Sequence, residues 1–278
     1  AMKKLNLLLT ILIGLSILSC SSDDDDNPQT QISQLTKIEQ RSFYNGTLEE
    51  KIIINYSNQK PELWSFYDET NQLTFTSEWN YSTNGNLISI KGYLPDGSLS
   101  SESNISYDNS NRIIQTIRSE ENNTYITSTN FIHNSDNTIT SNTDSNGNIS
   151  SKIFEINNNG IIDKEIENGN VIVSVQYDNL KPISKTSYST TYNYTYEENG
   201  SIPITFQSLF GANPINVVLF QNSLNDSSDS LTTELITEIA STSSTEEYVY
   251  TLNDDNFPAT RKDYYNGELD DEFDYFYE

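Results

Sequence analysis

Cysteine is almost absent from this chain, which has one, Cys20, among 278 residues. A single cysteine forms no internal disulfide, so the fold must depend on packing and strand pairing. Histidine is equally scarce, with His133 as its one example. These two absences exclude a His/Cys zinc site and a nucleophile–base arrangement built on such residues. The sequence also lacks a phosphate-binding glycine loop, and we expect no cofactor.

Basic residues are few, with 15 Lys and Arg against 40 Asp and Glu and a formal net charge of −25. Nucleic acid and anionic lipid surfaces repel such a chain, so we exclude nucleic acid as a partner. Removal of residues 1–19 would take away Lys3 and Lys4 and leave a formal charge of −27. Any attachment to a membrane must then come from acyl chains rather than from a basic patch.

The first twenty residues have the pattern of an export signal. Two lysines precede an apolar run over residues 5–18, which is too short for a stable membrane span. The segment that ends at Cys20 resembles the lipobox of bacterial lipoproteins, although Leu18 stands where a smaller residue is usual. The resemblance implies a signal peptide over residues 1–19 and a lipid on Cys20. The alternative is an ordinary signal peptide with an incidental cysteine.

An acidic run follows the cysteine directly and resembles the tag that sends Bacteroidota lipoproteins to the outer face of the outer membrane. It consists of Ser21, Ser22, Asp23, Asp24, Asp25 and Asp26. The resemblance implies an outer-membrane lipoprotein that faces the cell exterior. The alternative is a solvated linker that carries no sorting signal. We expect a flexible linker over residues 20–36 and a β domain over residues 37–278.

A turn unit recurs along the β domain. An aromatic or apolar residue at position 0 is followed by an apolar residue at position +6, and +4 is Asn or Gly in six of seven units. This spacing fits a hairpin with a three-residue loop, in which +4 has a left-handed backbone and residues 0 and +6 pair across the strands. The pairs are Tyr67/Leu73, Tyr81/Leu87, Tyr107/Ile113, His133/Ile139, Ile156/Ile162, Tyr177/Ile183 and Tyr196/Ile202.

A second turn signal, Asn-Gly or Asp-Gly, lies between the units and is typical of two-residue hairpins. Between turns the chain often alternates apolar and polar residues, as an antiparallel sheet with one wet face does. We therefore predict an all-β fold, a long antiparallel meander of at least about fifteen strands that curls or closes like a barrel. The second signals are at Asn45-Gly46, Asp96-Gly97, Asn146-Gly147, Asn168-Gly169 and Asn266-Gly267.

The turn units also resemble the YD repeats of bacterial cell-surface proteins. Tyr67-Asp68, Tyr107-Asp108 and Tyr177-Asp178 carry this resemblance, and only Asn111-Arg112-Ile113 approaches the usual arginine after the turn. With the lipobox, the chain resembles repeat-bearing Bacteroidota lipoproteins of unknown function. That resemblance implies a fold and a cellular location, but it implies no activity.

Residues 206–247 interrupt the units. This insertion holds the most apolar stretch beyond the signal, and we interpret it as a plug over one end of the sheet or as a loop or edge-strand excursion. Within it, the spacing of apolar residues over 231–239 predicts a short helix.

Few residues stand out as candidates for chemistry. Trp64 and Trp79 could stack on sugar rings, and the alternative is cross-strand core pairing. Acidic residues at 254–255 and 270–274 could bind calcium or form solvated turns. We interpret His133 as a structural stand-in for the tyrosine of sister units.

The sequence thus predicts a non-enzymatic lipoprotein that acts as a binding or structural accessory subunit at the outer membrane. Its partners would be the membrane through the lipid and an outer-membrane complex or a glycan. The alternatives are a glycan-binding protein for polysaccharide uptake and a glycosidase that uses two carboxylates.

Overall fold

The computed structural model describes residues 34–120, 124–201, 209–210, 213–223 and 234–278. Residues 33–278 form one compact unit, and the signal, the lipidation site and the acidic run lie outside the described residues. Helix α2 spans Pro214–Ser223. The strands are β1 (Leu35–Tyr44), β2 (Thr47–Ser57), β3 (Lys60–Asp68), β4 (Leu73–Tyr81), β5 (Leu87–Tyr93), β6 (Leu99–Tyr107), β7 (Ile113–Glu120), β8 (Tyr125–His133), β9 (Thr138–Ser145), β10 (Asn148–Ile156), β11 (Ile162–Glu167), β12 (Asn170–Asp178), β13 (Lys181–Ser187), β14 (Thr190–Ser201), β15 (Glu234–Ala240), β16 (Thr245–Leu252), β17 (Pro258–Tyr265) and β18 (Glu268–Tyr277).

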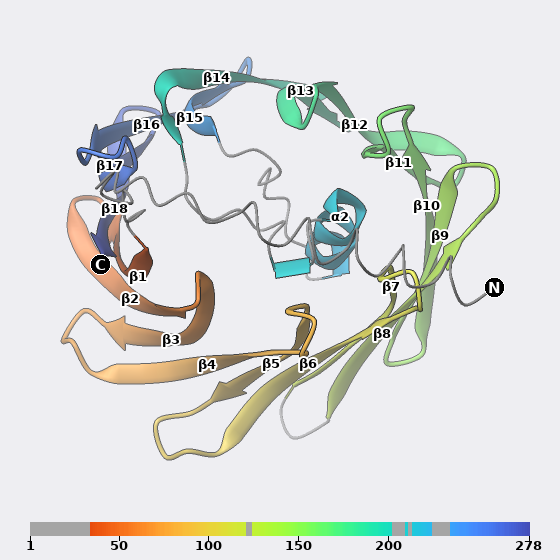
Figure 1. Cartoon of the computed structure of the whole chain (residues 1–278), viewed down its shortest axis with the longest axis horizontal. Coiled ribbons are helices and arrows are strands. Elements are labelled where there is room, and N and C mark those ends of the chain that lie inside the picture. Colours follow the sequence, from red (N-terminus) through yellow and green to blue (C-terminus); the bar gives the residue numbers. More distant parts are fainter. Residues whose placement is uncertain (1–33, 121–123, 202–208, 211–212, 224–233) are drawn as a thin grey trace, which may run out of the picture. The chain divides into compact units, whose positions relative to one another are not determined.

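These strands form one closed antiparallel barrel. Each strand pairs with its neighbours in sequence, and β18 returns to pair with β1. Gln34 and Glu278 complete the closure by exchanging two backbone hydrogen bonds of 2.8 and 2.9 Å. Figure 1 shows the ring of strands with α2 inside it. The predicted all-β meander is confirmed, and closure removes the edges that an open sheet would expose.

The turn unit also has the predicted geometry at five of its seven positions. The residues at 0 and +6 pair directly, as Tyr81 does with Leu87 and Tyr107 with Ile113. The +4 residues have the expected left-handed backbone, with φ of 64° at Asn71. The other pairings are Tyr67–Leu73, His133–Ile139 and Ile156–Ile162.

Two predicted units were wrong. Tyr177 pairs with Pro182 rather than Ile183, because the left-handed residue is Asn179 and the turn is one residue shorter. Tyr196 pairs with Ile236, because β14 continues to residue 201 instead of turning.

The turn type predicted for the one Asp-Gly hairpin was also wrong. At Asp96-Gly97, Tyr93 pairs with Leu99 and only the glycine has a positive φ, so the loop has three residues rather than two. The four Asn-Gly sites are two-residue turns in which both central residues have positive φ, as type I′ requires.

The helix expected over residues 231–239 was wrong as well. Residues 231–233 lie outside the described part, and β15 occupies Glu234–Ala240. The segment is rich in β-branched residues and fills the place between β14 and β16, so pairing on both sides outweighs the helical spacing. The helix forms instead at Pro214–Ser223, where Asn213 Oδ1 accepts the N–H of Ile215 and Pro214 starts the first turn.

The meander places its turns alternately at two rims. The N-terminal rim carries residue 34 and the turns at 82–86, 108–112, 134–138 and 157–161. The opposite rim carries all four Asn-Gly turns, at 45–46, 146–147, 168–169 and 266–267. No helix among the described residues is long and apolar enough to cross a membrane.

Candidate functional site

The inner wall of the barrel changes character between the two rims. On β7–β10 the part near the N-terminal rim is apolar, with Ile113, Phe131, Ile139 and Phe154 all nearly inaccessible to solvent. Towards the opposite rim the inward residues of these four strands are mostly hydroxyl-bearing and charged. Every second residue of a strand faces the lumen. Each of these strands therefore contributes apolar inward residues near one rim and polar inward residues near the other.

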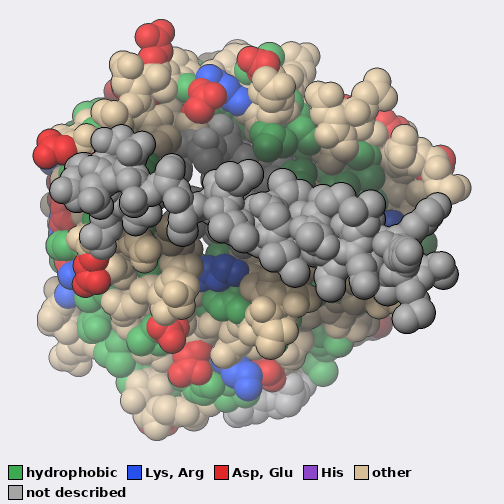
Figure 2. Space-filling model, viewed as in Figure 1, with side chains coloured by type: hydrophobic (Ala, Val, Ile, Leu, Met, Phe, Trp, Pro, Cys, Tyr) green, Lys and Arg blue, Asp and Glu red, His purple; other side chains and the backbone are tan. Residues whose placement is uncertain are grey.

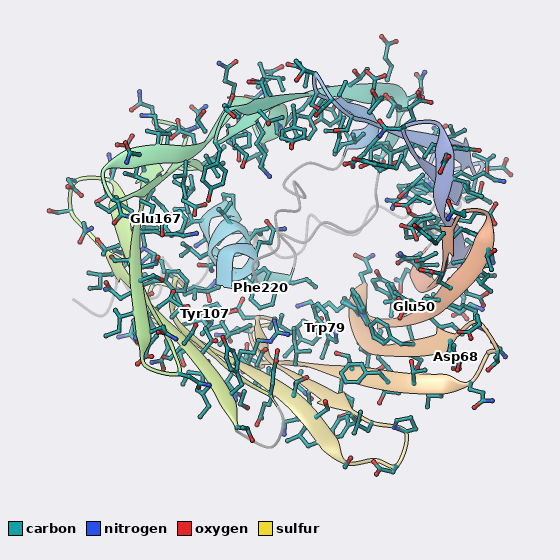
Figure 3. All side chains as sticks on the ribbon, turned by 180° about the vertical axis from the view of Figure 1, so that it is seen from behind. Glu50, Asp68, Trp79, Tyr107, Glu167 and Phe220 are labelled. Atoms are coloured by element: carbon teal, nitrogen blue, oxygen red, sulfur yellow. The ribbon has the colours of Figure 1, made fainter. Side chains whose placement is uncertain are left out.

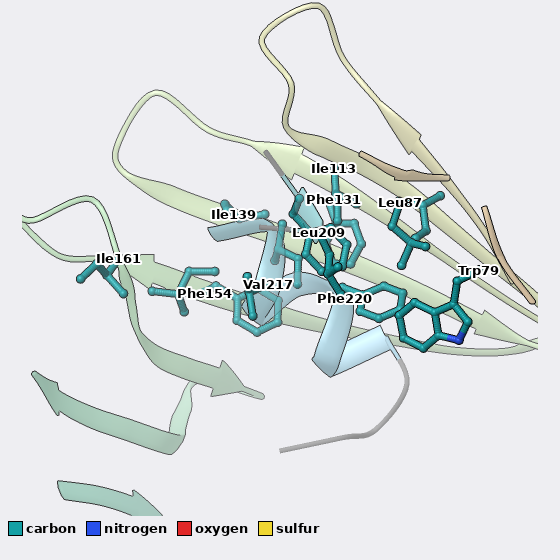
Figure 4. Close-up of a cluster of buried hydrophobic side chains, with 14 residues drawn as sticks. Trp79, Leu87, Ile113, Phe131, Ile139, Phe154, Ile161, Leu209, Val217 and Phe220 are labelled. Carbon is teal, nitrogen blue, oxygen red and sulfur yellow. The ribbon is translucent and has the colours of Figure 1, made fainter. Parts of the chain in front are cut away.

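Helix α2 fills the apolar half of the lumen. Figure 3 shows Trp79 and Tyr107 on the inner side of the wall and Phe220 on α2 within the ring. Phe220 is 2% exposed, and its ring centroid lies 5.0 Å from that of Phe210. Figure 4 shows this cluster, in which Leu209 and Val217 meet the wall residues. Of the insertion, residues 209–210 and 214–223 therefore lie where a plug was predicted.

A fully buried asparagine joins α2 to the wall. Asn216 Oδ1 accepts the backbone N–H of Ile113 at 2.8 Å, and its Nδ2 donates to the carbonyl of Asn111 at 2.8 Å. The side chain thus satisfies a donor and an acceptor beside the turn between β6 and β7. Buried backbone groups without partners are costly, so these two bonds fix the position of the helix as well as stabilising it.

The polar half of the lumen contains a cavity of about 290 Å³ on β7–β10. We call it the lumenal cavity. Phe131 and Phe154 form its deep end near the middle of the barrel, and Tyr125, 46% exposed, lies at the opposite rim. Its lining comprises Arg118, Glu120, Tyr125, Thr127, Thr129, Phe131, Ser141, Thr143, Ser145, Ser150, Lys152 and Phe154.

The hydroxyls of this cavity form cross-strand pairs. Thr127 and Ser145 lie 3.2 Å apart, and Thr129 and Thr143 lie 3.0 Å apart. Because a hydroxyl has one donor and two acceptor positions, each pair keeps hydrogen-bonding capacity for another molecule. The wall can therefore both donate to and accept from a polar ligand.

The two cations of the cavity each have a carboxylate partner. Arg118 Nη2 lies 2.6 Å from Glu120 Oε1, with both side chains more than a third exposed. Lys152 Nζ bonds Glu165, which is buried. Each cation is therefore neutralised within its own pair, and the cavity carries no excess positive charge.

A second buried charged pair lies on the inner wall of β17. Arg261 Nη2 lies 2.7 Å from Asp263 Oδ2, and its guanidinium stands 3.8 Å from the ring centroid of Phe273. Burial raises the pKa of the Asp263 carboxyl to about 6, against the opposing effect of Arg261. The pair packs among aromatic rings, which is the environment of a structural ion pair.

The carboxylates of the acidic runs do not gather at one point in the structure. The Asp271 carboxylate accepts hydrogen bonds from Gln40 and Ser42 inside the barrel, whereas Asp274 pairs with Arg41 outside. Asp271 and Asp274 therefore lie on opposite faces of the sheet and do not converge. Residues 254–255 lie in the turn between β16 and β17. Across the described ranges, no group of three or more acidic, histidine or cysteine side chains could hold a metal ion.

The two tryptophans pack on each other rather than at the surface. Trp64 and Trp79 stack with ring centroids 5.1 Å apart, and Trp79 is buried in the cluster that contacts α2. This geometry is the one expected if the two tryptophans pair across strands in the core. Trp79 is then too buried to stack on a sugar ring.

His133 occupies the place of a tyrosine in a repeated contact. Tyr107 OH donates to the carbonyl of Leu87 at 2.7 Å, and Tyr81 OH donates to that of Pro61 at 2.8 Å. His133 Nε2 lies 2.9 Å from the carbonyl of Ile113, the equivalent acceptor in the preceding turn. Each contact joins one hairpin to its neighbour, so the histidine has a structural partner.

We expect His133→Tyr to change the free energy of unfolding by less than about 1 kcal/mol, because tyrosine makes the same contact in sister units. His133→Phe should lower it by about 1 kcal/mol, because the Ile113 carbonyl then loses its partner. Denaturant unfolding measures both. A loss of ligand binding in a fully stable His133→Tyr protein would instead give the histidine a functional role.

Comparison with known proteins gives structural likenesses alone. No protein-family profile and no curated protein sequence matches the chain. A crystal structure of a porin-like protein from Bacteroides uniformis covers 88% of this chain and 98% of its own, with 14% identity and a TM-score of 0.41. The TcdB2-TccC3-Cdc42 complex covers 66% of this chain and 17% of its own, with 10% identity and a TM-score of 0.19. At these levels neither likeness assigns a function.

Proposed function

We propose that the chain is an outer-membrane lipoprotein whose barrel is a water-exposed binding module on the cell exterior. In this proposal Cys20 carries the lipid, and the surface-export signal is Ser21, Ser22, Asp23, Asp24, Asp25 and Asp26. The module acts as an accessory subunit that binds a partner or ligand, with no catalytic step of its own.

The observation that carries the proposal is the charged outer wall. Arg41 lies 2.8 Å from Asp274, and Lys164 lies 2.6 Å from Glu155, both on outward positions of paired strands. Figure 2 shows acidic and basic side chains around the circumference of the barrel. A lipid-facing barrel needs a continuous apolar band, and charges within that band are destabilising. This wall is suited to water, with membrane contact left to the acyl chains.

The position of residue 34 agrees with this arrangement. The chain joins the barrel at the N-terminal rim, where α2 fills the lumen. The mouth of the lumenal cavity lies at the opposite rim from residue 34. A partner or ligand would then reach the polar half of the lumen without passing α2.

Glycan binding is the second candidate, and the hydroxyl-lined cavity favours it. The carboxylate glycosidase stays a prediction from the sequence, and release of reducing sugars from polysaccharides tests it. Capture of partners from native outer membranes distinguishes an accessory subunit from a free-standing glycan receptor.

We expect residues 27–278 to purify without detergent as a folded β protein, because the outer wall is charged. Size-exclusion chromatography and far-UV circular dichroism in plain buffer measure this. The same fragment with its lumen disrupted by Phe154→Asp serves as an unfolded reference. A fragment that is insoluble in buffer yet folded in micelles would contradict the proposal.

A further inference from the structure

We propose that the lumenal cavity binds an uncharged saccharide of one or two rings, held by the wall hydroxyls and by two neutralised ion pairs. This inference rests on the proposed function, because it names the ligand class of the binding module. The cavity lies among inward residues of four consecutive strands, β7–β10, all within the described part of the barrel.

The charged residues of the cavity favour an uncharged ligand. Arg118 Nη2 lies 2.6 Å from Glu120 Oε1, and Lys152 Nζ bonds the buried carboxylate of Glu165. Glu167 lies directly across the β10–β11 ladder from Lys152 and adds a negative charge on the same face. An anionic ligand would therefore meet no unpaired cation. A cationic ligand would compete with Arg118 and Lys152 for the same carboxylates.

The Arg118–Glu120 pair keeps hydrogen-bonding capacity for a neutral ligand. A guanidinium carries five N–H donors and a carboxylate has two acceptor oxygens, so their mutual contact uses only part of each group. Both side chains are more than a third exposed and line the cavity. Side by side, they offer donors and acceptors to neighbouring hydroxyls of one sugar ring, and hydrogen bonds to charged groups are stronger than neutral ones.

Size and wall chemistry point to a sugar. A volume of about 290 Å³ lies near the lower end of small-molecule sites, which start at about 300 Å³. Hydroxyl side chains are the largest group in the lining, and each can donate and accept, as the hydroxyls of a sugar require. They are Thr127, Thr129, Ser141, Thr143, Ser145 and Ser150.

Aromatic residues supply the apolar part of the site. Tyr125 lies at the mouth with 46% of its surface exposed, so one face can pack against the C–H face of a sugar ring. Phe131 and Phe154 form the deep end and are 4% and 1% exposed. They limit how far a ligand enters from the opposite rim.

The test is isothermal titration calorimetry on the full chain in mild detergent. The probes are cellobiose, mannobiose and digalactose, each compared with the uronic acid disaccharide of the same configuration and linkage. We expect at least one neutral probe to bind, and to bind about tenfold more tightly than its acidic counterpart, which brings a carboxylate to a cavity without a free cation. Its affinity should change little as salt is raised, because no net charge is neutralised. Binding of no neutral probe, or equal or tighter binding of the acidic ones, would overturn the inference.

A single hydroxyl of the wall places the ligand in the cavity. Thr143, which lies 3.0 Å from Thr129, becomes a side chain of similar shape without a hydroxyl in Thr143→Val. This variant should weaken binding of the neutral probe by about fivefold or more. Thr251→Val is the matched control, because Thr251 forms the same kind of cross-strand pair with Thr260, at 2.7 Å, in an exposed position of β16. It should change the affinity by less than about twofold. Unchanged binding in a folded Thr143→Val protein would move the ligand elsewhere and overturn the inference.

The ring at the mouth is tested by two substitutions of one residue. Tyr125→Ala removes the stacking face and should weaken binding by about fivefold or more, whereas Tyr125→Phe keeps the face and should change it by less than about threefold. Both affinities are measured by the same calorimetry, with the melting temperature followed in parallel. An alanine variant that binds as tightly as the parent would contradict the proposed placement of the sugar.

The role of charge is tested by Glu120→Gln, which leaves Arg118 without its carboxylate. The pair is exposed, so the melting temperature should stay nearly unchanged. The preference for the neutral over the acidic probe should fall by about threefold or more, because the cavity gains a free cation. An unchanged preference would show that the paired charges do not set the selectivity. If the lipoprotein is surface-exposed but binds no neutral sugar, this inference fails and the proposed function stands.

Discussion

Replacement of Phe220 by alanine is expected to lower the free energy of unfolding by about 3–5 kcal/mol, the usual loss for a buried phenylalanine. Phe220 is 2% exposed and contacts Phe210 and the cluster of wall residues around Trp79. Truncation leaves a cavity between α2 and the wall that the closed barrel cannot collapse to fill. Denaturant unfolding, followed by tryptophan fluorescence, measures the change and reports on the nearby indoles.

Phe276→Ala is the matched control for this prediction. Phe276 lies on the outer wall of β18 with 39% of its surface exposed and Lys37 above its ring. We expect a loss of at most about 1.5 kcal/mol, because little apolar area leaves the core. Equal losses for both variants would show that α2 is not anchored in the lumen.

Replacement of Cys20 by alanine is expected to abolish lipid labelling and release the protein from the membrane. The acyl chains provide the attachment in our proposal, each buried methylene contributing about 0.8 kcal/mol, and the charged outer wall offers no substitute. Metabolic labelling with an alkyne fatty acid and fractionation of cells measure the two effects.

Ser21→Ala is the control for the lipidation experiment, because it alters the adjacent residue and keeps the thiol. It should label and fractionate like the parent. A Cys20→Ala protein that still labels as strongly as the parent would show that the lipobox resemblance is misleading.

Much of the fold could be predicted because its information is local. Asn71 and Gly85 adopt left-handed backbones within a few residues of the pairs they organise, so the hairpins can be read from short windows. One of the exceptions is also local in origin. At Tyr177 the left-handed residue is Asn179, two positions earlier than the spacing predicted, which shortens the turn.

The site could not be predicted because its residues meet only after the sheet curls. Arg118 and Lys152 are 34 positions apart and neither belongs to a motif. Helix α2 did have a local signal, the Asn213-Pro214 pair at its start, which the apolar composition around it concealed. Its place in the lumen depends on the hydrogen bond between Asn216 and Ile113, two residues that are more than a hundred positions apart in the sequence.

Barrel closure has a consequence for synthesis of the chain. The pairing of β1 with β18 joins residues about 230 to 240 positions apart, so β1 has only one neighbour until Glu268–Tyr277 has been synthesised. Until then the nascent chain presents two unpaired strand edges, which favour aggregation or capture by another chain. A stop before Glu268 would remove β18 and with it the whole ladder to β1. A chain released before β18 is made would therefore be prone to aggregation, and a chaperone would have to protect nearly its whole length.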